Sequence, residues 1–401
     1  MSRSRPLKVG ILTTDNRFHF KEYQKPEPSF GTAVAALFQG LAQFPSEIEV
    51  HVISATQEPL ASPVRLASNI YYHSLLVPKL GWLRTAYQGC IRAVRAKVRE
   101  LDLDLVHGQG TERDCAVEAV FSGRPNLLTL HGNMRAVARA LHAPPFSYHW
   151  FHALLESFAV RRTGMVFCNS FYTESLVRPL NSRVVLMPNP VREIFFSPLP
   201  ATAPRPDPQL RLLVVGLICS YKQPLEVLRA LRRWREQGAP RFQCRWIGAL
   251  SGEMGYVRSF AAELEAAKNA GWADHLVSVD EKELRDLMDA SDVLVHVPKE
   301  EAFGLVVAEA MVRGLKVVGA RAGGIPDFAK LYPGIVLVDP HKPSEWSQGL
   351  ESALRIGPTR IARQDWNFLK FHPREVAQQH IRHYHELSRR RESPPSTLPP
   401  R

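Results

Sequence analysis

The residues Lys299–Phe328, which read KEEAFGLVVAEAMVRGLKVVGARAGGIPDF, decide the predicted fold. With the apolar run before them, they predict a strand, a loop, a helix over 305–313, a second strand and a second loop. The helix is apolar on all sides except at Glu309 and Arg313, so we expect it to be buried. Its start would present free N–H groups and the positive end of the helix dipole. This predicts an anion site, most often used for phosphate, at three residues: Phe303, Gly304 and Leu305.

A second interpretation of the same residues needs no ligand. Glu309 and Arg313 are spaced i,i+4 and would form a helical ion pair worth about 0.2–0.5 kcal/mol. Glu301 would then be a solvated loop charge, and Gly304 an ordinary turn glycine. Composition alone favours this interpretation.

The order of the motifs resembles a known family signature. Glu301 and Glu309 flank an Ala-Phe-Gly turn, and Glu-Ala-Met, Gly, Val-Val and Gly-Gly-Ile-Pro follow. This order is similar to the donor site of retaining glycosyltransferases of family four, which have the GT-B fold. The resemblance implies an α/β protein with two doubly wound, Rossmann-like parallel sheets facing across a cleft. It also implies a nucleotide-diphosphate sugar of the UDP or GDP type as donor, with no separate cofactor.

Composition and charge restrict the function further. The chain has 401 residues, 45% of them hydrophobic and 22% charged, which is typical of a globular protein of two or three domains. Its five cysteines are scattered without metal-ligand spacing, so we expect neither zinc nor disulfides. No secretory or membrane-spanning run is found, which predicts a cytoplasmic protein. The net charge of +12 favours an anionic partner, and no nucleic-acid-binding module is present.

One basic helix offers a hypothesis about membranes. Residues 83–101 combine an apolar stripe with arginines beside it, such as Arg84, Arg92 and Arg95. Most such helices are solvated domain faces. As a hypothesis, this one makes peripheral contact with an anionic membrane, with its arginines at the head groups.

Alternating strands and helices divide the chain into domains. Six short apolar runs precede a proline-rich segment, and six more follow it. We predict an acceptor-side domain over 1–196, a linker over 197–211 and a nucleotide-sugar-binding domain over 212–372. A helix over 373–390 would return to the first domain, and 391–401 would be a disordered tail.

Polar residues at strand ends are the candidates in the first domain, because doubly wound sheets bind ligands at the carboxyl ends of their strands. His131 ends the run LLTLH, and on its own it would more often be a structural hydrogen-bonder. The resemblance implies that His131 faces the hydroxyls of the donor sugar. It also implies that the backbone at Gly31 approaches substrate and phosphate, although Phe30 stands where many relatives have another glycine. Glu112 and Arg113 would contact the acceptor or cap the next helix.

The second domain opens with VGLICSYKQP. Relatives place an arginine, a lysine and a glycine here, with both cations on the donor phosphates. Lys222 matches the lysine, whereas Leu217 replaces the arginine and Gln223 replaces the glycine. The alternative for Lys222 is a surface lysine with a buried stem.

Two motifs are set aside. Asp102-Leu103-Asp104 has the pattern of a metal-binding Asp-x-Asp, but it precedes a strand instead of following one, so we interpret it as a helix-to-strand connection. Gly108-Gln109-Gly110 lacks the third glycine of a dinucleotide fingerprint.

These features predict a metal-independent retaining hexosyltransferase of polysaccharide or glycolipid biosynthesis. Its acceptor would be a glycan, a lipid-linked molecule or a small molecule. Glu301, His131 and Lys222 would be catalytic, Glu301 accepting hydrogen bonds from sugar hydroxyls and Glu309 from the ribose diol. Leu217 and Gln223 motivate an alternative, a pseudo-enzyme that binds nucleotide sugars or glycans without turnover. A further alternative is a sugar-nucleotide epimerase of the same fold.

Overall fold

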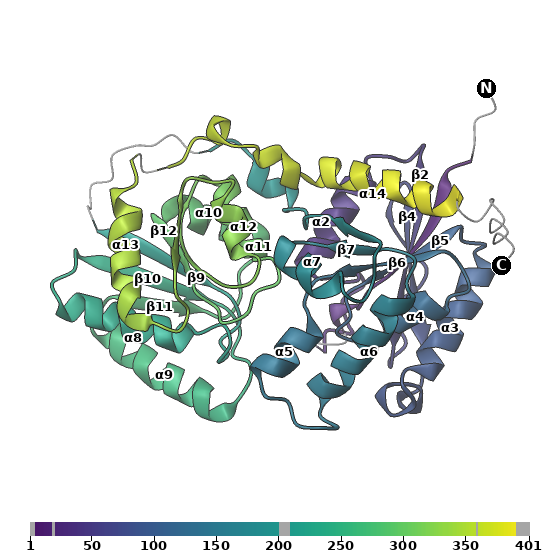
Figure 1. Cartoon of the computed structure of the whole chain (residues 1–401), viewed down its shortest axis with the longest axis horizontal. Helices are drawn as coiled ribbons and strands as arrows, with labels where there is room; N and C mark the ends of the chain where they lie inside the picture. Colours follow the sequence, from purple (N-terminus) through teal and green to yellow (C-terminus); the bar gives the residue numbers. More distant parts are fainter. Residues whose placement is uncertain (1–4, 18–20, 200–208, 358–359, 390–401) are drawn as a thin grey trace, which may run out of the picture. The chain divides into compact units, whose positions relative to one another are not determined.

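A computed structural model describes residues 5–17, 21–199, 209–357 and 360–389. It consists of two compact units (Figure 1). Unit 1 comprises Met1–Pro190 with His372–Arg401, and unit 2 comprises Val191–Phe371. The boundary therefore lies after Pro190 and not after residue 196, because Val191 and Phe195 are buried in a core of unit 2. Most of the predicted linker and the whole predicted tail lie outside the described residues.

Within the described residues, unit 1 contains an eight-stranded sheet in the order β3-β4-β2-β1-β5-β6-β7-β8. All neighbouring strands pair in parallel except β3 and β4, which are antiparallel. The strands are β1 (Leu7–Leu12), β2 (Ile48–Thr56), β3 (Val64–Ala67), β4 (Ile70–Leu76), β5 (Leu105–Gln109), β6 (Asn126–Leu130), β7 (Val166–Cys168) and β8 (Val184–Leu186). The edge strand β3 and its neighbour β4 were not predicted.

Helices cover both faces of this sheet. They are α2 (Thr32–Leu41), α3 (Gln88–Glu100), α4 (Cys115–Phe121), α5 (Met134–Ala140), α6 (Tyr148–Arg162), α7 (Phe171–Val177) and α14 (Pro373–Arg389). One core joins β1 and β2 to α2 and α14, and a second joins the opposite face to α3, α4 and α6. Successive residues of β1 show the two faces, since Ile11 belongs to the first core and Leu12 to the second.

The C-terminal helix α14 packs directly on α2, and Figure 1 shows the two helices side by side. Gly40 of α2 makes this packing possible. A Cβ atom at residue 40 would lie 2.1 Å from the carbonyl oxygen of Pro373 and 2.8 Å from the Cβ of Ala377. A side chain there would force the two helices apart.

The basic segment of unit 1 differs from its prediction. A single 3₁₀ turn, Leu83–Thr85, ends at Ala86 and Tyr87, both with positive φ, so α3 begins only at Gln88. Ile91, Val94 and Val98 are buried in the protein core. The predicted apolar stripe therefore stabilises unit 1 itself and does not face outward.

Within the described residues, unit 2 contains a six-stranded parallel sheet in the order β11-β10-β9-β12-β13-β14. Its strands are β9 (Leu210–Val215), β10 (Phe242–Ile247), β11 (Ala273–Leu276), β12 (Val293–His296), β13 (Lys316–Ala320) and β14 (Ile335–Val338). Its helices are α8 (Pro224–Glu236), α9 (Met254–Asn269), α10 (Glu281–Ala290), α11 (Leu305–Val312), α12 (Ile325–Ala329) and α13 (Trp346–Arg355). All six strands predicted here are present, although β11 begins and ends earlier than expected.

Two cores hold the sheet of unit 2 between helix layers. Leu212 and Val214 of β9 belong to the core under α8, α9 and α13, whereas Leu213 belongs to the core under α10 and α11. Strands buried on both faces have continuous apolar sequences such as LRLLVV, which is typical of parallel sheets.

Candidate active site

The predicted anion site lies in unit 2, at the start of α11. Gly304 has a φ of +88°, a left-handed conformation that glycine adopts at little cost, and this turn directs the chain into the helix. The Gly304 carbonyl accepts hydrogen bonds from the amides of Val307 and Ala308. In the part of the chain that the structure describes, the amides of Leu305 and Val306 have no protein acceptor. These N–H groups and the helix dipole form an anion-binding end.

Three charged or polar side chains meet beside this helix start. The Lys222 ammonium donates to Oε2 of Glu301 at 2.6 Å, and Nε2 of His296 lies 2.9 Å from the same oxygen. A Cβ atom at Gly304 would lie 3.5 Å from the Cγ of Glu301, so the carboxylate is next to the turn. The structure thus brings Lys222 to Glu301, which lies 79 residues further along the chain, beside the turn at Gly304.

The pair of Lys222 and Glu301 is ionised. Burial by itself raises the pKa of Glu301, but the Lys222 ammonium and the hydrogen bond from His296 hold that pKa at about 2. Burial lowers the pKa of Lys222, and the Glu301 carboxylate more than offsets this, so the net shift is upward. Both groups therefore stay charged at neutral pH, and in the structure the Glu301 carboxylate balances the charge of the Lys222 ammonium.

The Gly-Gly-Ile-Pro loop fixes the position of Glu301. The amide of Gly324 donates to the Glu301 carbonyl at 2.8 Å. Gly323 has a φ of +59°, and a Cβ atom there would lie 1.9 Å from that carbonyl oxygen. Glycine is required at residue 323 because the loop there passes directly against the backbone of Glu301 with a positive φ.

The side chain of Phe303 has a structural role. It is buried and packs edge-on against Phe328 at a centroid distance of 5.0 Å, and also against Phe371. Its contribution to an anion site is therefore limited to its backbone, while its ring anchors the turn to the core of unit 2.

Glu309 is buried within α11, but its partner is Arg192 and not Arg313. Arg192 donates to Oε1 of Glu309 from Nη2 at 2.8 Å and from Nε at 3.1 Å. Burial raises the pKa of Glu309, and the Arg192 guanidinium opposes this shift only in part. The i,i+4 ion pair that the sequence offered as an alternative is wrong.

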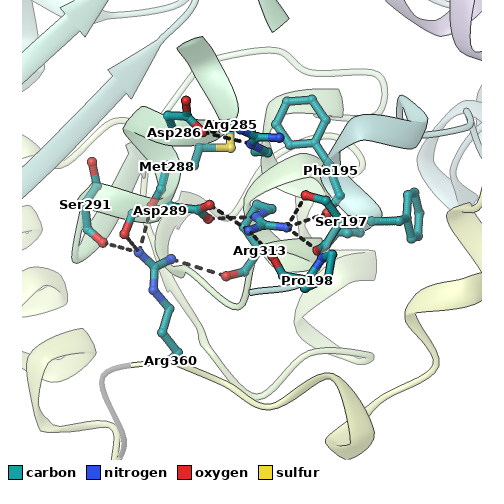
Figure 2. Close-up of polar contacts among 12 residues, drawn as sticks. Phe195, Ser197, Pro198, Arg285, Asp286, Met288, Asp289, Ser291, Arg313 and Arg360 are labelled. Carbon is teal, nitrogen blue, oxygen red and sulfur yellow. Dashed lines mark hydrogen bonds and ion pairs between the residues drawn. The ribbon is translucent and has the colours of Figure 1, made fainter. Parts of the chain in front are cut away.

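Arg313 instead belongs to a separate structural cluster (Figure 2). It donates to both carboxylate oxygens of Asp289, at 2.7 and 2.6 Å, and to the carbonyls of Phe195 and Ser197. Arg360 donates to three carbonyls at the C-terminal end of α10, those of Met288, Asp289 and Ser291. Because Arg313 is buried and fully engaged here, it does not replace the arginine missing at Leu217.

The loop after β9 holds Lys222 by an unusual backbone conformation. Gln223, directly before α8, has a φ of +61°, which is left-handed and costly for a residue other than glycine. Its buried amide donates to the carbonyls of Val297 at 2.9 Å and Pro340 at 3.0 Å. Gln223 thus adopts a backbone conformation that glycine would adopt at little cost. Leu217 is 45% exposed at the carboxyl end of β9.

His131 and Gly31 belong to unit 1. Nε2 of His131 donates to Oε1 of Gln109 at 2.7 Å, and its ring also hydrogen-bonds to Asn189. Burial lowers the pKa of His131 to about 4, so the imidazole is neutral at pH 7. Gly31 precedes α2, and nothing lies within 4 Å of a Cβ atom placed there. His131, Gln109 and Asn189 line one narrow cavity with Ala33 of α2.

Two residues of the candidate site were not predicted. His296 ends β12, so the rule that selected His131 also applies to it. Arg192 carries no comparable signal, because only the fold brings it to Glu309, which lies far along the sequence.

Among the described residues, one group of side chains has the spacing of a metal site. Cys90, Asp114 and Glu118 offer ligand atoms within 4.8 Å of one another, all buried in unit 1. Burial and the neighbouring Asp114 raise the pKa of Glu118 well above its usual value. This favours the protonated, neutral form of Glu118, which is a poor metal ligand. The interpretation of Asp102-Leu103-Asp104 as a helix-to-strand connection is confirmed, since these residues lie between the end of α3 and the start of β5. Of the helices described, none has the length and hydropathy to cross a bilayer.

Two α/β units, each built on a doubly wound and mainly parallel sheet, define a GT-B glycosyltransferase fold. Solved structures show the same fold. Sucrose-phosphate synthase from Thermosynechococcus elongatus matches with a TM-score of 0.68 and 15% identity over 96% of this chain and 97% of that one. An α,α-trehalose-phosphate synthase (UDP-forming) from Burkholderia xenovorans, in complex with glucose-6-phosphate, matches with a TM-score of 0.69 and 13% identity over 95% and 99%.

The chain belongs to glycosyltransferase family 4. The model for Glycosyltransferase Family 4 matches residues 31–193, and the model for Glycosyl transferases group 1 matches residues 199–366. A D-inositol 3-phosphate glycosyltransferase from Corynebacterium diphtheriae is 33% identical over 150 residues, which are 36% of this chain and 34% of the relative. The matched region thus spans about a third of that relative's length.

Proposed function

We propose that this chain is a retaining, metal-independent glycosyltransferase that uses a nucleotide-diphosphate sugar of the UDP or GDP type. The observation that carries the proposal is the placement of the Lys222 ammonium, 2.6 Å from Glu301, beside the unsatisfied start of α11. The site thus combines a fixed cation with backbone N–H donors, and a diphosphate group requires both.

The reaction needs positive potential where the bond breaks. When the bond between the anomeric carbon and the diphosphate breaks, negative charge builds up on the departing oxygen. Lys222 and the amides of Leu305 and Val306 would stabilise that charge without a divalent cation. A hydroxyl of the acceptor attacks the anomeric carbon from the face that the diphosphate leaves. The diphosphate takes the hydroxyl proton, and the anomeric configuration is retained.

The remaining polar groups would orient the donor. The Glu301 carboxylate is an acceptor for sugar hydroxyls and stays ionised, because its pKa is held at about 2. Glu309 would accept hydrogen bonds from the ribose diol while it keeps its hydrogen bond from Arg192. Neutral His131 would hydrogen-bond to a sugar hydroxyl. Gly31 leaves open space at its Cα, which would allow substrate to approach the backbone closely.

The names of the relatives support a phosphorylated or polyol acceptor for this chain. One relative is named as acting on D-inositol 3-phosphate, and one structural neighbour was solved with glucose-6-phosphate. A glycan or lipid-linked acceptor fits the same chemistry. We place the reaction on the cytoplasmic side, with peripheral membrane contact through the exposed arginines of α3 as a further part of the proposal.

Steady-state transfer tests the proposal. The wild type, Lys222→Ala and Leu217→Arg would be assayed against a panel of UDP- and GDP-sugars, with the anomeric configuration of the product determined by NMR. We expect Lys222→Ala to abolish measurable transfer, and Leu217→Arg to leave it unchanged or raise it. Wild-type rates in Lys222→Ala would refute the phosphate role of Lys222. An inert wild type that gains activity only through Leu217→Arg would indicate a pseudo-enzyme.

A further inference from the structure

Helix α6 of unit 1 carries apolar side chains on its exposed side. It packs against α4 and α5 (Figure 1), and it buries His152 and Glu156, which lie one turn apart on its inner side. Trp150, Leu154 and Phe158 also follow one another at intervals of one turn, on the opposite side of the helix. Leu154 is 50% exposed, and the two rings are half-buried. A surface helix usually turns its apolar side inward and its polar side outward, so α6 reverses the common arrangement.

Two further rings extend this apolar row at its ends. Phe146 precedes α6, is 89% exposed and has its ring centroid 5.3 Å from that of Trp150. Its φ of +66° is left-handed, which is costly for a bulky side chain. At the other end, the ring of Phe121 from α4 stacks on Phe158 at 5.7 Å and is 41% exposed. We call these five residues, Phe121, Phe146, Trp150, Leu154 and Phe158, the α6 stripe. An exposed apolar surface that begins in a strained loop indicates an interaction site.

The exposed charges beside the α6 stripe are positive. Arg161 and Arg162 are exposed at the C-terminal end of α6, and the Arg162 guanidinium lies 3.9 Å from the ring centroid of Phe158. Each guanidinium donates to a backbone carbonyl one turn earlier, and in the described part of the chain neither is paired with a carboxylate. None of the four acidic residues within 105–173 is exposed: Glu112, Asp114, Glu118 and Glu156. A partner on the stripe would therefore meet positive charge that nearby carboxylates do not balance, which favours an acidic partner.

Charge and composition distinguish the three kinds of partner that an exposed apolar row can bind. A second copy of the chain would place Arg161 and Arg162 against the same arginines, so charge opposes it. A lipid surface is served by lysine and arginine alike, whereas the segment 105–173 contains arginines and no lysine. Protein interfaces are enriched in tryptophan, phenylalanine and arginine and depleted in lysine. The guanidinium group also pairs with carboxylates through two parallel hydrogen bonds. These features favour an acidic protein.

We propose that the α6 stripe docks an acidic amphipathic helix of a different protein. The apolar side chains of that helix, spaced three and four residues apart, pack over Trp150, Leu154 and Phe158. Carboxylates beside them pair with Arg161 and Arg162. From Trp150 to Phe158 the helix rises about 12 Å, so about three turns of the partner helix cover it. This docking does not depend on the glycosyltransferase activity proposed above.

Fluorescence anisotropy with a designed peptide tests the proposal. The probe is a stapled, labelled helix of about 18 residues, or five turns, with leucine at every third or fourth position and glutamate between. We expect the full-length wild type to bind it at least about ten-fold more tightly than a scrambled peptide of equal composition or a copy with lysine for glutamate. No binding by the wild type, or equal binding of the scrambled peptide, would overturn the proposal.

Matched variants locate the binding surface. Leu154→Ser and Arg162→Gln should each weaken binding of the acidic peptide about five- to ten-fold. Two controls should keep the wild-type affinity. Leu250→Ser replaces a leucine of unit 2 that is also 50% exposed, and Arg92→Gln replaces an exposed arginine of α3. Urea unfolding confirms that all four variants are folded. Equal losses in the variants and their controls would contradict docking on the α6 stripe.

The other two occupants have their own assays. Leu154→Ser and Leu250→Ser are compared with the wild type by sedimentation with vesicles of phosphatidylcholine and phosphatidylglycerol, and by analytical ultracentrifugation without lipid. We expect both variants to behave as the wild type does in both assays. Vesicle binding or a dimer that is lost in Leu154→Ser and kept in Leu250→Ser would show that a membrane or a second copy covers the stripe, and would overturn the proposal.

Discussion

Arg192 holds the carboxylate that we expect to bind ribose. In the structure, both close contacts from Arg192 reach the same oxygen of Glu309, and a second carboxylate, Glu281, lies 3.8 Å from another nitrogen of Arg192. Glu309 is buried in α11, whereas Glu281 is 45% exposed at the start of α10. Both glutamates lie close to Arg192, but Glu309 is buried and Glu281 is exposed. Mutation of Glu281 is therefore a matched control for mutation of Glu309.

Glu309→Gln should weaken the binding of nucleoside diphosphate about ten-fold, because an amide replaces an acceptor of charge-assisted hydrogen bonds to ribose. Glu281→Gln should leave the affinity unchanged. Isothermal titration measures both, with urea unfolding to confirm that each variant is folded. If the two variants bind as tightly as the wild type, Glu309 serves only to pair Arg192.

The backbone conformation and the hydrogen bonds of Gln223 lead to a prediction about the free energy of unfolding. Gln223→Ala keeps the left-handed conformation and removes two buried hydrogen bonds, so we expect a loss of about 2–3 kcal/mol in the free energy of unfolding. Gln223→Gly loses the same bonds but relieves the backbone, and it should be about 1 kcal/mol more stable than the alanine variant. Urea unfolding of both variants checks this order. A glycine variant no more stable than the alanine variant would show that the positive φ carries no cost.

At the scale of elements, the loop that contains Gly323 positions Glu301. Gly323→Ala should lower nucleotide affinity. A Cβ atom at residue 323 would lie only 1.9 Å from the carbonyl oxygen of Glu301, so the backbone of Glu301 would have to move. Gly271 is the control, since its φ of +73° imposes a similar strain while no atom lies within 4 Å of a Cβ atom there. Calorimetry should show weaker binding for Gly323→Ala only. Equal affinities for the two variants would mean that the loop does not position the site.

The sequence predicted these elements to different degrees, for physical reasons. Strands buried on both faces, such as Val293–His296, have continuous apolar runs that stand out in any sequence. The antiparallel edge pair β3 and β4 was missed because Val64–Ala67 is short and only partly buried, so its residues show no apolar run. The start of α3 was misplaced because the left-handed residues Ala86 and Tyr87 interrupt an otherwise helical pattern.

The candidate site shows the same division. The start of α11 and Lys222 were predictable, because glycine turns and strand ends leave a local signal in the sequence. Arg192 and the partner of Arg313 were not, because ion pairs between distant segments depend on tertiary packing alone. Spacing suggested Glu309 with Arg313, yet each side chain found a buried partner elsewhere.

At the scale of the whole molecule, the net charge is +12, and the basic residues behind it have two kinds of role, one structural and one proposed in ligand binding. Arg313, Arg360 and Arg363 donate hydrogen bonds to backbone carbonyls within unit 2. These three side chains therefore have a structural role, because they supply hydrogen-bond donors to main-chain acceptors. Lys222, also in unit 2, lies beside the helix start that we propose to bind the donor diphosphate.

The most direct measurement is isothermal titration of UDP and GDP, in the presence of EDTA, into the wild type and Lys222→Ala. In the proposed site, Lys222 and the start of α11 would supply the positive potential, so the wild type should bind one of the two nucleotides with the metal chelated. Lys222→Ala should bind it at least about ten-fold more weakly, the effect of losing one charge-assisted hydrogen bond. Binding that requires added magnesium or manganese, or an affinity that Lys222→Ala leaves unchanged, would contradict the proposed donor site.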